Sequence, residues 1–348
     1  NLNEKSIEEI LQTDKLKEIK TSLANNQPHR NCQACYYQEE QGNTTTLRQH
    51  YQRNYPYTDD NIELRFLDIR WNNKCNLACQ YCVPSLSSVW EKKLNIKSTS
   101  GRKNYQDQLL RWILSKSNTI NEIMMVGGEP MLMKQNFVLL NKLPVDCKIS
   151  IITNLNYDIN TLSCYNDIVA RPADNIIWNV SAENTGQQFE YVRNGSKWDE
   201  FEHNLQRLLV QWPRTVCLNM VYSMFNAFDF ADIIKSYMHL GVKKFNLMPI
   251  TENDAIDIFK WPEHTKQTAI AQLEEARAYH ANHFQEDADL YPINGLDNLI
   301  LDLQSQQNNV IIAKQEVIDK VSWYDQWHTA ITFKQLWPHV WKEANKLL

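Results

Sequence analysis

Short apolar segments rich in β-branched residues alternate with longer amphipathic segments from about residue 62 to residue 250. The apolar segments predict six strands, at residues 64–71, 120–126, 147–153, 175–182, 215–223 and 243–249. The amphipathic segments predict helices between them, at residues 104–117, 134–142, 158–170, 197–211 and 228–240. Strands and helices at this spacing form parallel βαβ units with right-handed crossovers. The pattern therefore predicts an α/β fold, a partial (β/α)6 TIM-like barrel; a full eight-stranded barrel would need two further units, which the pattern does not show.

The two ends of the chain differ from this middle part. Residues 1–60 are polar and contain no strong strand, and Ser6-Ile7-Glu8-Glu9 fits a capping box that opens a helix. Beyond residue 260 the chain reads as helical and is rich in aromatic residues. We therefore expect a small cysteine module at 1–60, a barrel core at 61–252 and a helical extension at 253–348. Because the first residue is Asn and not Met, we expect the chain to be a fragment or a processed form.

Composition narrows the classes of function. The 348 residues are 43% hydrophobic and carry a net charge of −5, without a block of like charge, so nothing favours nucleic acid or a membrane as partner. No apolar run approaches the roughly 20 residues of a membrane span, and no signal peptide is seen. A large chain of this kind uses motif-spaced cysteines for metals more often than for disulfides. We expect a cytoplasmic protein in which the single cysteines Cys147, Cys164 and Cys217 pack as free thiols.

Three cysteines, Cys75, Cys79 and Cys82, follow the first predicted strand with the spacing C-x3-C-x2-C. Chemistry in parallel sheets of this kind gathers at the carboxyl ends of the strands. Three thiolates can hold three irons of a [4Fe-4S] cluster and leave the fourth iron without a protein ligand. An open iron can bind and reduce a small molecule, so the spacing indicates a reactive cluster. The alternative is a zinc site completed by a distant fourth ligand.

A second motif, Gly127-Gly128-Glu129-Pro130, ends the second predicted strand. Two glycines let a ligand approach the backbone closely, and the carboxylate that follows them can pair with a cationic amine. The alternative is a tight turn with a solvated glutamate. The position at the next strand end after the cysteine triplet favours the ligand site.

Together the two motifs resemble those of radical S-adenosylmethionine enzymes, over roughly residues 62–250. The triplet matches the cluster motif of that family, and Tyr81 is the usual aromatic residue before its last cysteine. The second motif matches the GGEP type, which in that family binds the amino group of the methionine moiety, so the resemblance assigns Gly127, Gly128, Glu129 and Pro130 to S-adenosyl-L-methionine.

The resemblance implies two cofactors, a [4Fe-4S] cluster and S-adenosyl-L-methionine. It implies that the ligand is cleaved reductively to methionine and a 5′-deoxyadenosyl radical, which abstracts hydrogen from a substrate in the barrel mouth. An oxygen-sensitive cluster and an electron donor such as flavodoxin or ferredoxin are implied with it.

Other residues at predicted strand ends fit the same resemblance. Thr153-Asn154 could reach the ribose, with a simple turn as the alternative. Ser181 and Glu183 stand where residues of that family contact the ribose or the carboxylate of the ligand. Arg193 resembles the residue that pairs bidentately with this carboxylate, with a surface salt bridge as the alternative. Met248 could pack on the adenine or in the core.

A separate pair, Cys32 and Cys35, precedes the barrel with the spacing C-x2-C, which suits zinc, an iron–sulfur cluster or a redox pair. With the stretch at 1–11 it resembles half of an auxiliary-cluster module of the SPASM or twitch kind, here placed before the core. Stretches 39–48 and 84–90 also resemble that subgroup. Because only two ligands are seen, we hypothesise that the chain starts inside this module. An auxiliary iron–sulfur cluster, zinc and a free or disulfide-bonded pair stay open.

The sequence leaves the substrate, the reaction outcome and the oligomeric state open, because a fold does not fix a substrate. Related enzymes with auxiliary clusters favour a peptide or protein side chain, and a carbohydrate or nucleoside-like small molecule is the alternative. A non-catalytic iron–sulfur or zinc-binding protein is the alternative from another class, although it would not need an amine-binding carboxylate. An enzyme that uses S-adenosylmethionine for methyl or aminocarboxypropyl transfer is a further alternative.

Overall fold

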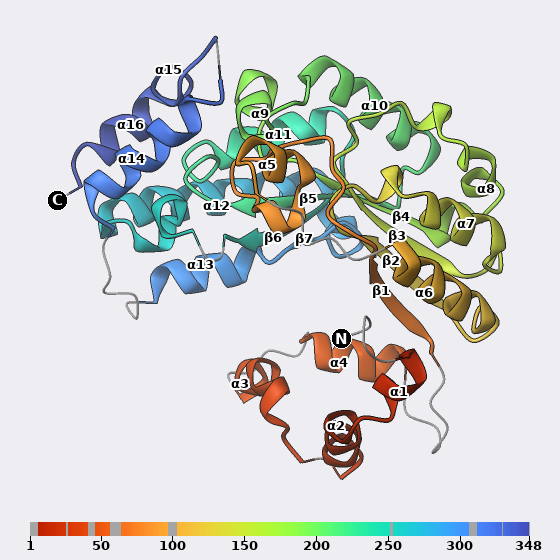
Figure 1. The fold of residues 1–348 in the computed structure, drawn as a ribbon. Coiled ribbons are helices and arrows are strands. Elements are labelled where there is room, and N and C mark those ends of the chain that lie inside the picture. Colours follow the sequence, from red (N-terminus) through yellow and green to blue (C-terminus); the bar gives the residue numbers. More distant parts are fainter. Residues whose placement is uncertain are drawn as a thin grey trace.

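The structure is a computed structural model that describes residues 6–25, 27–40, 46–55, 64–96, 103–250, 253–305, 312–328 and 330–347. Within this part of the chain, seven strands form a single all-parallel sheet in the order β1-β2-β3-β4-β5-β6-β7. Helices cover one face of the sheet, and the strands curve as an open barrel (Figure 1). The predicted α/β fold with a partial barrel is confirmed. The bounds of the strands are β1 Phe66–Arg70, β2 Glu122–Val126, β3 Lys148–Thr153, β4 Ile176–Ser181, β5 Val216–Tyr222, β6 Lys244–Pro249 and β7 Ile293–Asn294.

All six predicted strands are present, each within two residues of its predicted ends. One short strand lies beyond the six predicted ones, since β7 pairs in parallel with β6. Two residues are too few to give an apolar period, so the sequence carries no signal for this strand. The sheet therefore continues beyond residue 252 into the helical extension.

Buried and less buried side chains alternate along the central strands, as expected for a sheet that is covered by helices on one face. Ile149, Ile151, Trp178 and Val180 are fully buried, and their neighbours Ile177 and Asn179 are half-buried. The buried set packs under the helices that follow each strand, and it forms one continuous core. These helices are α6 (Lys103–Ser115), α7 (Lys134–Lys142), α10 (Trp198–Gln211), α11 (Phe230–His239) and α12 (Glu263–Phe284).

The helix predicted at 158–170 is wrong as a single element. The chain forms a short 3-10 helix at Ile159–Thr161 and then α8 (Tyr165–Val169), with Leu162 extended between them (φ −69°, ψ 132°). Two short helices, α5 (Ser88–Lys93) and α9 (Gly186–Val192), lie outside the predicted set. Both follow the carboxyl ends of strands, and both contribute to the site described below.

Residues before the barrel form four helices in the described part: α1 (Ile7–Leu11), α2 (Asp14–Ala24), α3 (Gln33–Glu40) and α4 (Leu47–Asn54). The predicted capping box is confirmed, since Ser6 Oγ accepts from the Glu9 amide and Glu9 Oε2 accepts from the Ser6 amide. The Tyr55 hydroxyl donates to Glu122 Oε2 (2.7 Å), and the rings of Tyr51 and Phe66 lie 5.0 Å apart. Because Phe66 and Glu122 begin β1 and β2, these helices lie at the amino end of the sheet (Figure 1). Residues 1–5, part of the stretch that resembles an auxiliary module, lie outside the described residues.

The end of the chain is helical, as predicted, apart from β7. It contains α13 (Leu296–Gln304), α14 (Lys314–Asp325), α15 (Phe333–Leu336) and α16 (Pro338–Ala344). No described helix is both long and apolar enough to cross a membrane. None of the eight cysteines, all of which lie in the described residues, forms a disulfide. Cys147 and Cys164 are buried, whereas Cys217 is half-buried.

Candidate active site

The loop that carries Cys75, Cys79 and Cys82 leaves the carboxyl end of β1 and is held by hydrogen bonds to distant parts of the chain. The amides of Ala78 and Gln80 donate to the carbonyls of Asn194 and Val192, both at 2.9 Å. The Ser87 hydroxyl donates to the Leu77 carbonyl (2.7 Å). The loop is therefore a fixed part of the structure, and Cys79 is buried in it while the other two thiols are half-buried.

Burial raises the pKa of the three thiols, that of Cys82 to about 11, and repulsion from neighbouring thiols adds to this effect at Cys79 and Cys82. Two side-chain donors lie against their sulfurs: Asn154 Nδ2 is 3.7 Å from Cys75 Sγ, and Arg193 Nη1 is 3.8 Å from Cys79 Sγ. Such donors stabilise thiolates, but three adjacent thiolates also need cations, and the irons of a cluster supply them. The donor set thus fits an iron–sulfur cluster.

Within the described residues, no group of three or more His, Cys, Asp or Glu side chains surrounds a point where one metal ion could bind. A four-iron cluster needs no such point, because each thiolate binds a different iron. A zinc ion does need one, since its ligands meet at a single centre at about 2.3 Å from each sulfur. The cluster and the zinc alternative both stay predictions for the triplet.

The two glycines at the end of β2 lie against the backbone of the cysteine loop. A Cβ on Gly128 would stand 2.2 Å from the Lys74 carbonyl oxygen, and one on Gly127 (φ +123°) would stand 3.0 Å from the Asn72 oxygen. The Glu129 amide donates to the Lys74 carbonyl (2.8 Å). The sequence suggested that these glycines make room for a ligand; in the structure they make room for the cysteine loop, so the two predicted motifs are in direct contact.

Glu129 is completely buried between β2 and β3. Its Oε1 accepts from the Met131 amide (3.1 Å) and the Thr153 hydroxyl (2.9 Å), and its Oε2 accepts from the Asn154 amide (2.8 Å). Burial raises the pKa of Glu129 to about 7, although these three donors act in the opposite direction. Its charge also raises the pKa of Cys75. The alternative of a solvated glutamate is wrong, and Thr153 and Asn154 serve Glu129 and the cysteine loop.

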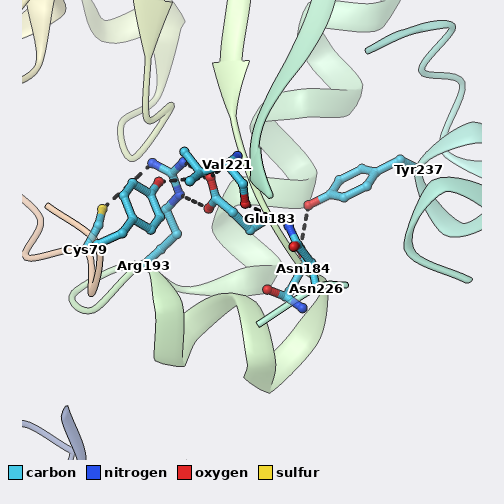
Figure 2. Close-up of polar contacts among 8 residues, drawn as sticks. Cys79, Glu183, Asn184, Arg193, Val221, Asn226 and Tyr237 are labelled. Carbon is cyan, nitrogen blue, oxygen red and sulfur yellow. Dashed lines mark hydrogen bonds and ion pairs between the residues drawn. The ribbon is translucent and has the colours of Figure 1, made fainter. Parts of the chain in front are cut away.

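Glu183 and Arg193 form a buried ion pair beside Cys79 (Figure 2), and the half-buried Tyr81 joins it. Arg193 donates from Nε to Glu183 Oε2 and from Nη2 to Glu183 Oε1, both at 2.8 Å. The Tyr81 hydroxyl donates to Glu183 Oε1 (2.9 Å). The ion pair of Arg193 is thus buried, so the alternative of a surface salt bridge is wrong. Contact of Arg193 with a ligand carboxylate stays a prediction.

The carboxyl end of β4 holds this network in place from behind. The Tyr237 hydroxyl donates to the Asn184 carbonyl (2.6 Å), and Asn184 Nδ2 donates to the Phe225 carbonyl (2.9 Å). The Val221 amide is 3.4 Å from Glu183 Oε1. In Figure 2 the labelled side chains run in a row from Cys79 through Arg193 and Glu183 to Tyr237, which belongs to α11.

The helical extension packs directly on the cysteine loop, which sequence reasoning missed. Trp90 of α5 donates from Nε1 to the Cys79 carbonyl (2.9 Å). Its ring stacks on Trp323 at 5.1 Å and meets Trp327 edge-on at 5.5 Å. The abundance of tryptophan in this extension was visible in the sequence, but its partner was not.

His328 makes the second contact between the extension and the loop. Gln80 Nε2 lies 2.7 Å from His328 Nε2, and the His328 ring stacks on Tyr191 at 4.1 Å. Because an amide nitrogen only donates, His328 accepts through Nε2 and is neutral in this contact. Burial lowers the pKa of His328, which favours this neutral form.

The remaining predicted ligand contacts lie on the same side of the sheet. Ser181 ends β4 and is half-buried, and Met248 near the end of β6 is 43% exposed. The core alternative is therefore wrong for Met248, whereas its neighbour Leu247 is in the core. Contacts of Ser181 and Met248 with ribose and adenine stay predictions.

Cys32 and Cys35 lie far from this site in the fold. Both are half-exposed at the start of α3, and no other metal-binding side chain joins them within the described residues. Cys35 is close enough to Arg48 of α4 to raise the pKa of that guanidinium, after the larger effect of Glu39. Since α4 packs at the amino end of β1 and β2, this pair and the triplet are at opposite ends of the sheet.

No protein-family model and no curated protein sequence matches this chain. Its fold is similar over part of the chain to that of several solved structures. One is native anSMEcpe with bound AdoMet, with a TM-score of 0.47, 16% identity and coverage of 64% of this chain and 62% of that one. Another is SuiB of Streptococcus suis bound to its precursor peptide SuiA, with a TM-score of 0.44, 14% identity and coverage of 75% of this chain and 61% of that one. A third is the radical S-adenosylmethionine methyltransferase TsrM of Kitasatospora setae with cobalamin and a [4Fe-4S] cluster bound. Its TM-score is 0.36, with 12% identity and coverage of 53% of this chain and 34% of that one. The chain spans less than two thirds of the length of each.

Proposed function

We propose that this protein is a radical S-adenosylmethionine enzyme. The observation that carries the proposal is the direct contact between its two motifs: the Glu129 amide donates to Lys74 in the cysteine loop, and the Glu129 carboxylate is close enough to Cys75 to raise the pKa of that thiol. A buried carboxylate beside three clustered thiols is destabilising by itself. It becomes useful when a cationic amine binds next to an iron–sulfur cluster.

The chain's own residues hold and shield the reactants. Cys75, Cys79 and Cys82 would bind three irons of a [4Fe-4S] cluster, which supplies the electron that cleaves S-adenosylmethionine to methionine and a 5′-deoxyadenosyl radical. Glu129 would receive the amino group of the ligand, since Oε2 accepts only one hydrogen bond from the protein. Asn154, Ser181, Glu183 and Met248 would contact the rest of the ligand along the carboxyl edge of the sheet.

The substrate would enter at the inner face of the open barrel. This face carries neutral polar side chains across four neighbouring strands, among them Ser150, Asn179, Asn219 and Asn246. Amide and hydroxyl groups suit an uncharged hydrogen-bonding substrate, which is consistent with a peptide and also with a sugar. We retain the peptide or protein side chain as substrate class. An electron donor such as flavodoxin or ferredoxin and a reducing compartment such as the cytoplasm belong to the same proposal.

The test is anaerobic reduction of the iron-reconstituted protein in the presence of S-adenosylmethionine. We expect 5′-deoxyadenosine and methionine in equal amounts, and loss of both products in the Cys79→Ala variant. A methyl- or aminocarboxypropyl-transfer enzyme would instead release S-adenosylhomocysteine or methylthioadenosine. A protein that binds iron but yields none of these products with dithionite would be the non-catalytic alternative.

We also retain the auxiliary metal site in the proposal. If Cys32 and Cys35 hold a metal in the intact protein, that metal lies at the amino end of the sheet, away from the inner face where the substrate would meet the radical. A site there would stabilise the four N-terminal helices more directly than it would contact the substrate.

A further inference from the structure

Arg193 is bound on three sides in the interior of the protein. Two of its nitrogens donate to Glu183 at 2.8 Å each, a third lies 3.8 Å from Cys79 Sγ, and the Tyr81 ring lies 5.5 Å from its Cζ. The side chains of Arg193 and Glu183 are only 5% and 1% exposed. The guanidinium is therefore fixed against the sulfur of a predicted cluster ligand (Figure 2).

This geometry gives Arg193 a structural role beside the one that the resemblance assigned to it. Glu183 takes up Nε and one hydrogen of Nη2, so Nη1 and the second hydrogen of Nη2 face the cysteine loop and the ligand side. Without the guanidinium, Glu183 would be a buried carboxylate left with the Tyr81 hydroxyl and the Val221 amide as donors. Breaking a buried ion pair by removal of one partner is strongly destabilising, because the remaining charge is uncompensated.

The charge of Arg193 is also secure. A guanidinium is not deprotonated in proteins, and the Glu183 carboxylate pairs with this one at 2.8 Å. The side chain therefore stays protonated whether or not an electron enters the neighbouring site, and it can act as a constant positive group.

We propose that Arg193, held by Glu183 and Tyr81, is a positioning residue that sets the reduction potential of the cluster through Cys79, independently of any contact with the ligand. The inference rests on the proposed function, since it requires the cluster. Hydrogen bonds to cluster sulfurs and nearby charges are among the means by which proteins set cluster potentials. A donor on Cys79 Sγ stabilises the reduced state more, because that state carries one more negative charge.

Replacing Arg193 and replacing Glu183 should shift the reduction potential of the cluster in opposite directions. Arg193→Gln removes the positive group and leaves the negative one, so reduction becomes less favourable. Glu183→Gln leaves Arg193 uncompensated beside Cys79, so reduction becomes more favourable. We expect the equilibrium constant for one-electron reduction to change by about tenfold in each case, which is about 59 mV for a one-electron couple.

The experiment is a redox titration of anaerobically reconstituted protein followed by electron paramagnetic resonance, together with iron analysis and calorimetric titration with S-adenosylmethionine. Arg214→Gln is the matched control, because Arg214 forms an exposed pair with Asp174 (2.8 Å) just before the amino ends of β5 and β4, whereas the cysteine loop leaves the carboxyl end of β1. This control should leave the potential unchanged. If Arg193→Gln fails to fold, Arg193→Lys keeps the charge without the planar fork. It should then shift the potential in the same direction by less.

Opposite shifts of the reduction potential in the Arg193 and Glu183 variants, measured before the ligand is added, are the expected result. Equal potentials in both variants would overturn the inference, as would shifts in the same direction. A loss of ligand affinity of a hundredfold or more in the Arg193 variants at an unchanged potential would instead assign Arg193 to the ligand carboxylate. A wild-type protein that takes up no reducible cluster would refute the proposed function itself, and this outcome is seen before any variant is compared.

Discussion

Replacement of Gly128 by alanine tests the contact between the two motifs. The new Cβ would stand 2.2 Å from the Lys74 carbonyl oxygen, 2.6 Å from its carbon and 2.7 Å from the Asn73 carbonyl carbon. All three atoms belong to the backbone, so no flexible side chain can move aside. Since real Cβ atoms essentially never approach closer than 3.0 Å, the cysteine loop or the end of β2 must shift by about 0.8 Å.

The cost can be worked out from two terms. Overpacking of a closely packed site costs about 1–3 kcal/mol. The shift also weakens the hydrogen bond from the Glu129 amide to the Lys74 carbonyl, now 2.8 Å, which contributes about 0.5–1.5 kcal/mol. We therefore expect Gly128→Ala to lower the free energy of unfolding by about 2–4 kcal/mol.

Urea unfolding of the cluster-free protein measures this loss, and iron analysis after anaerobic reconstitution shows whether the displaced loop still binds a cluster. Gly186→Ala is the matched control, because a Cβ there meets nothing within 4 Å although the backbone is left-handed (φ +57°). The control should cost about 1–2 kcal/mol and leave iron binding intact. A Gly128→Ala protein as stable as the control, with full iron content, would refute the inference that these glycines serve the cysteine loop.

Three further predictions concern other parts of the molecule. Because burial raises the pKa of Glu129 from 4.5 to about 7, the protonated carboxyl favours the folded cluster-free protein at low pH. This contribution declines by about 3 kcal/mol as pH rises from about 4.5 through about 7, and unfolding measurements should show no such decline in Glu129→Gln; an equal decline in both proteins would contradict this. His328→Phe keeps the stack on Tyr191 but removes the acceptor of Gln80 Nε2. It should lower the free energy of unfolding by about 1 kcal/mol and speed the loss of iron to a chelator. A wild-type rate of iron loss would contradict a role of His328 in holding the cysteine loop. Joint replacement of Cys32 and Cys35 by alanine should remove all iron beyond four per chain if they hold an auxiliary cluster, and an unchanged content of four would exclude that cluster.

The sequence revealed the parts of the fold that repeat. The six longer strands are buried β-branched runs with a clear period, and each lies within two residues of its prediction. β7 could not be found in this way, since its two residues, Ile293 and Asn294, are positioned by pairing with β6. The helix expected at 158–170 divides because Asp158 caps a short 3-10 turn through the Asn160 amide, which its apolar period does not show.

The sequence predicted those residues of the candidate site that lie in short motifs, but it did not predict the contacts between residues far apart in the chain. The cysteine triplet and the glycine pair each occupy a few consecutive residues. The pairing of Glu183 with Arg193 depends instead on α9, which returns the chain to the carboxyl end of β4. The contact of Gln80 with His328 joins positions 248 residues apart, so only the folded chain reveals that the helical extension supports the cysteine loop.

The central claim is that the cysteine triplet and Glu129 form one site that cleaves S-adenosylmethionine by one-electron reduction. Its most direct test is the yield of 5′-deoxyadenosine when the reconstituted protein is reduced with dithionite in the absence of oxygen. We expect the product from the wild type, a much lower yield from Glu129→Gln with its cluster intact, and none from Cys79→Ala. A wild-type protein with a fully reducible four-iron cluster and no 5′-deoxyadenosine would contradict the claim.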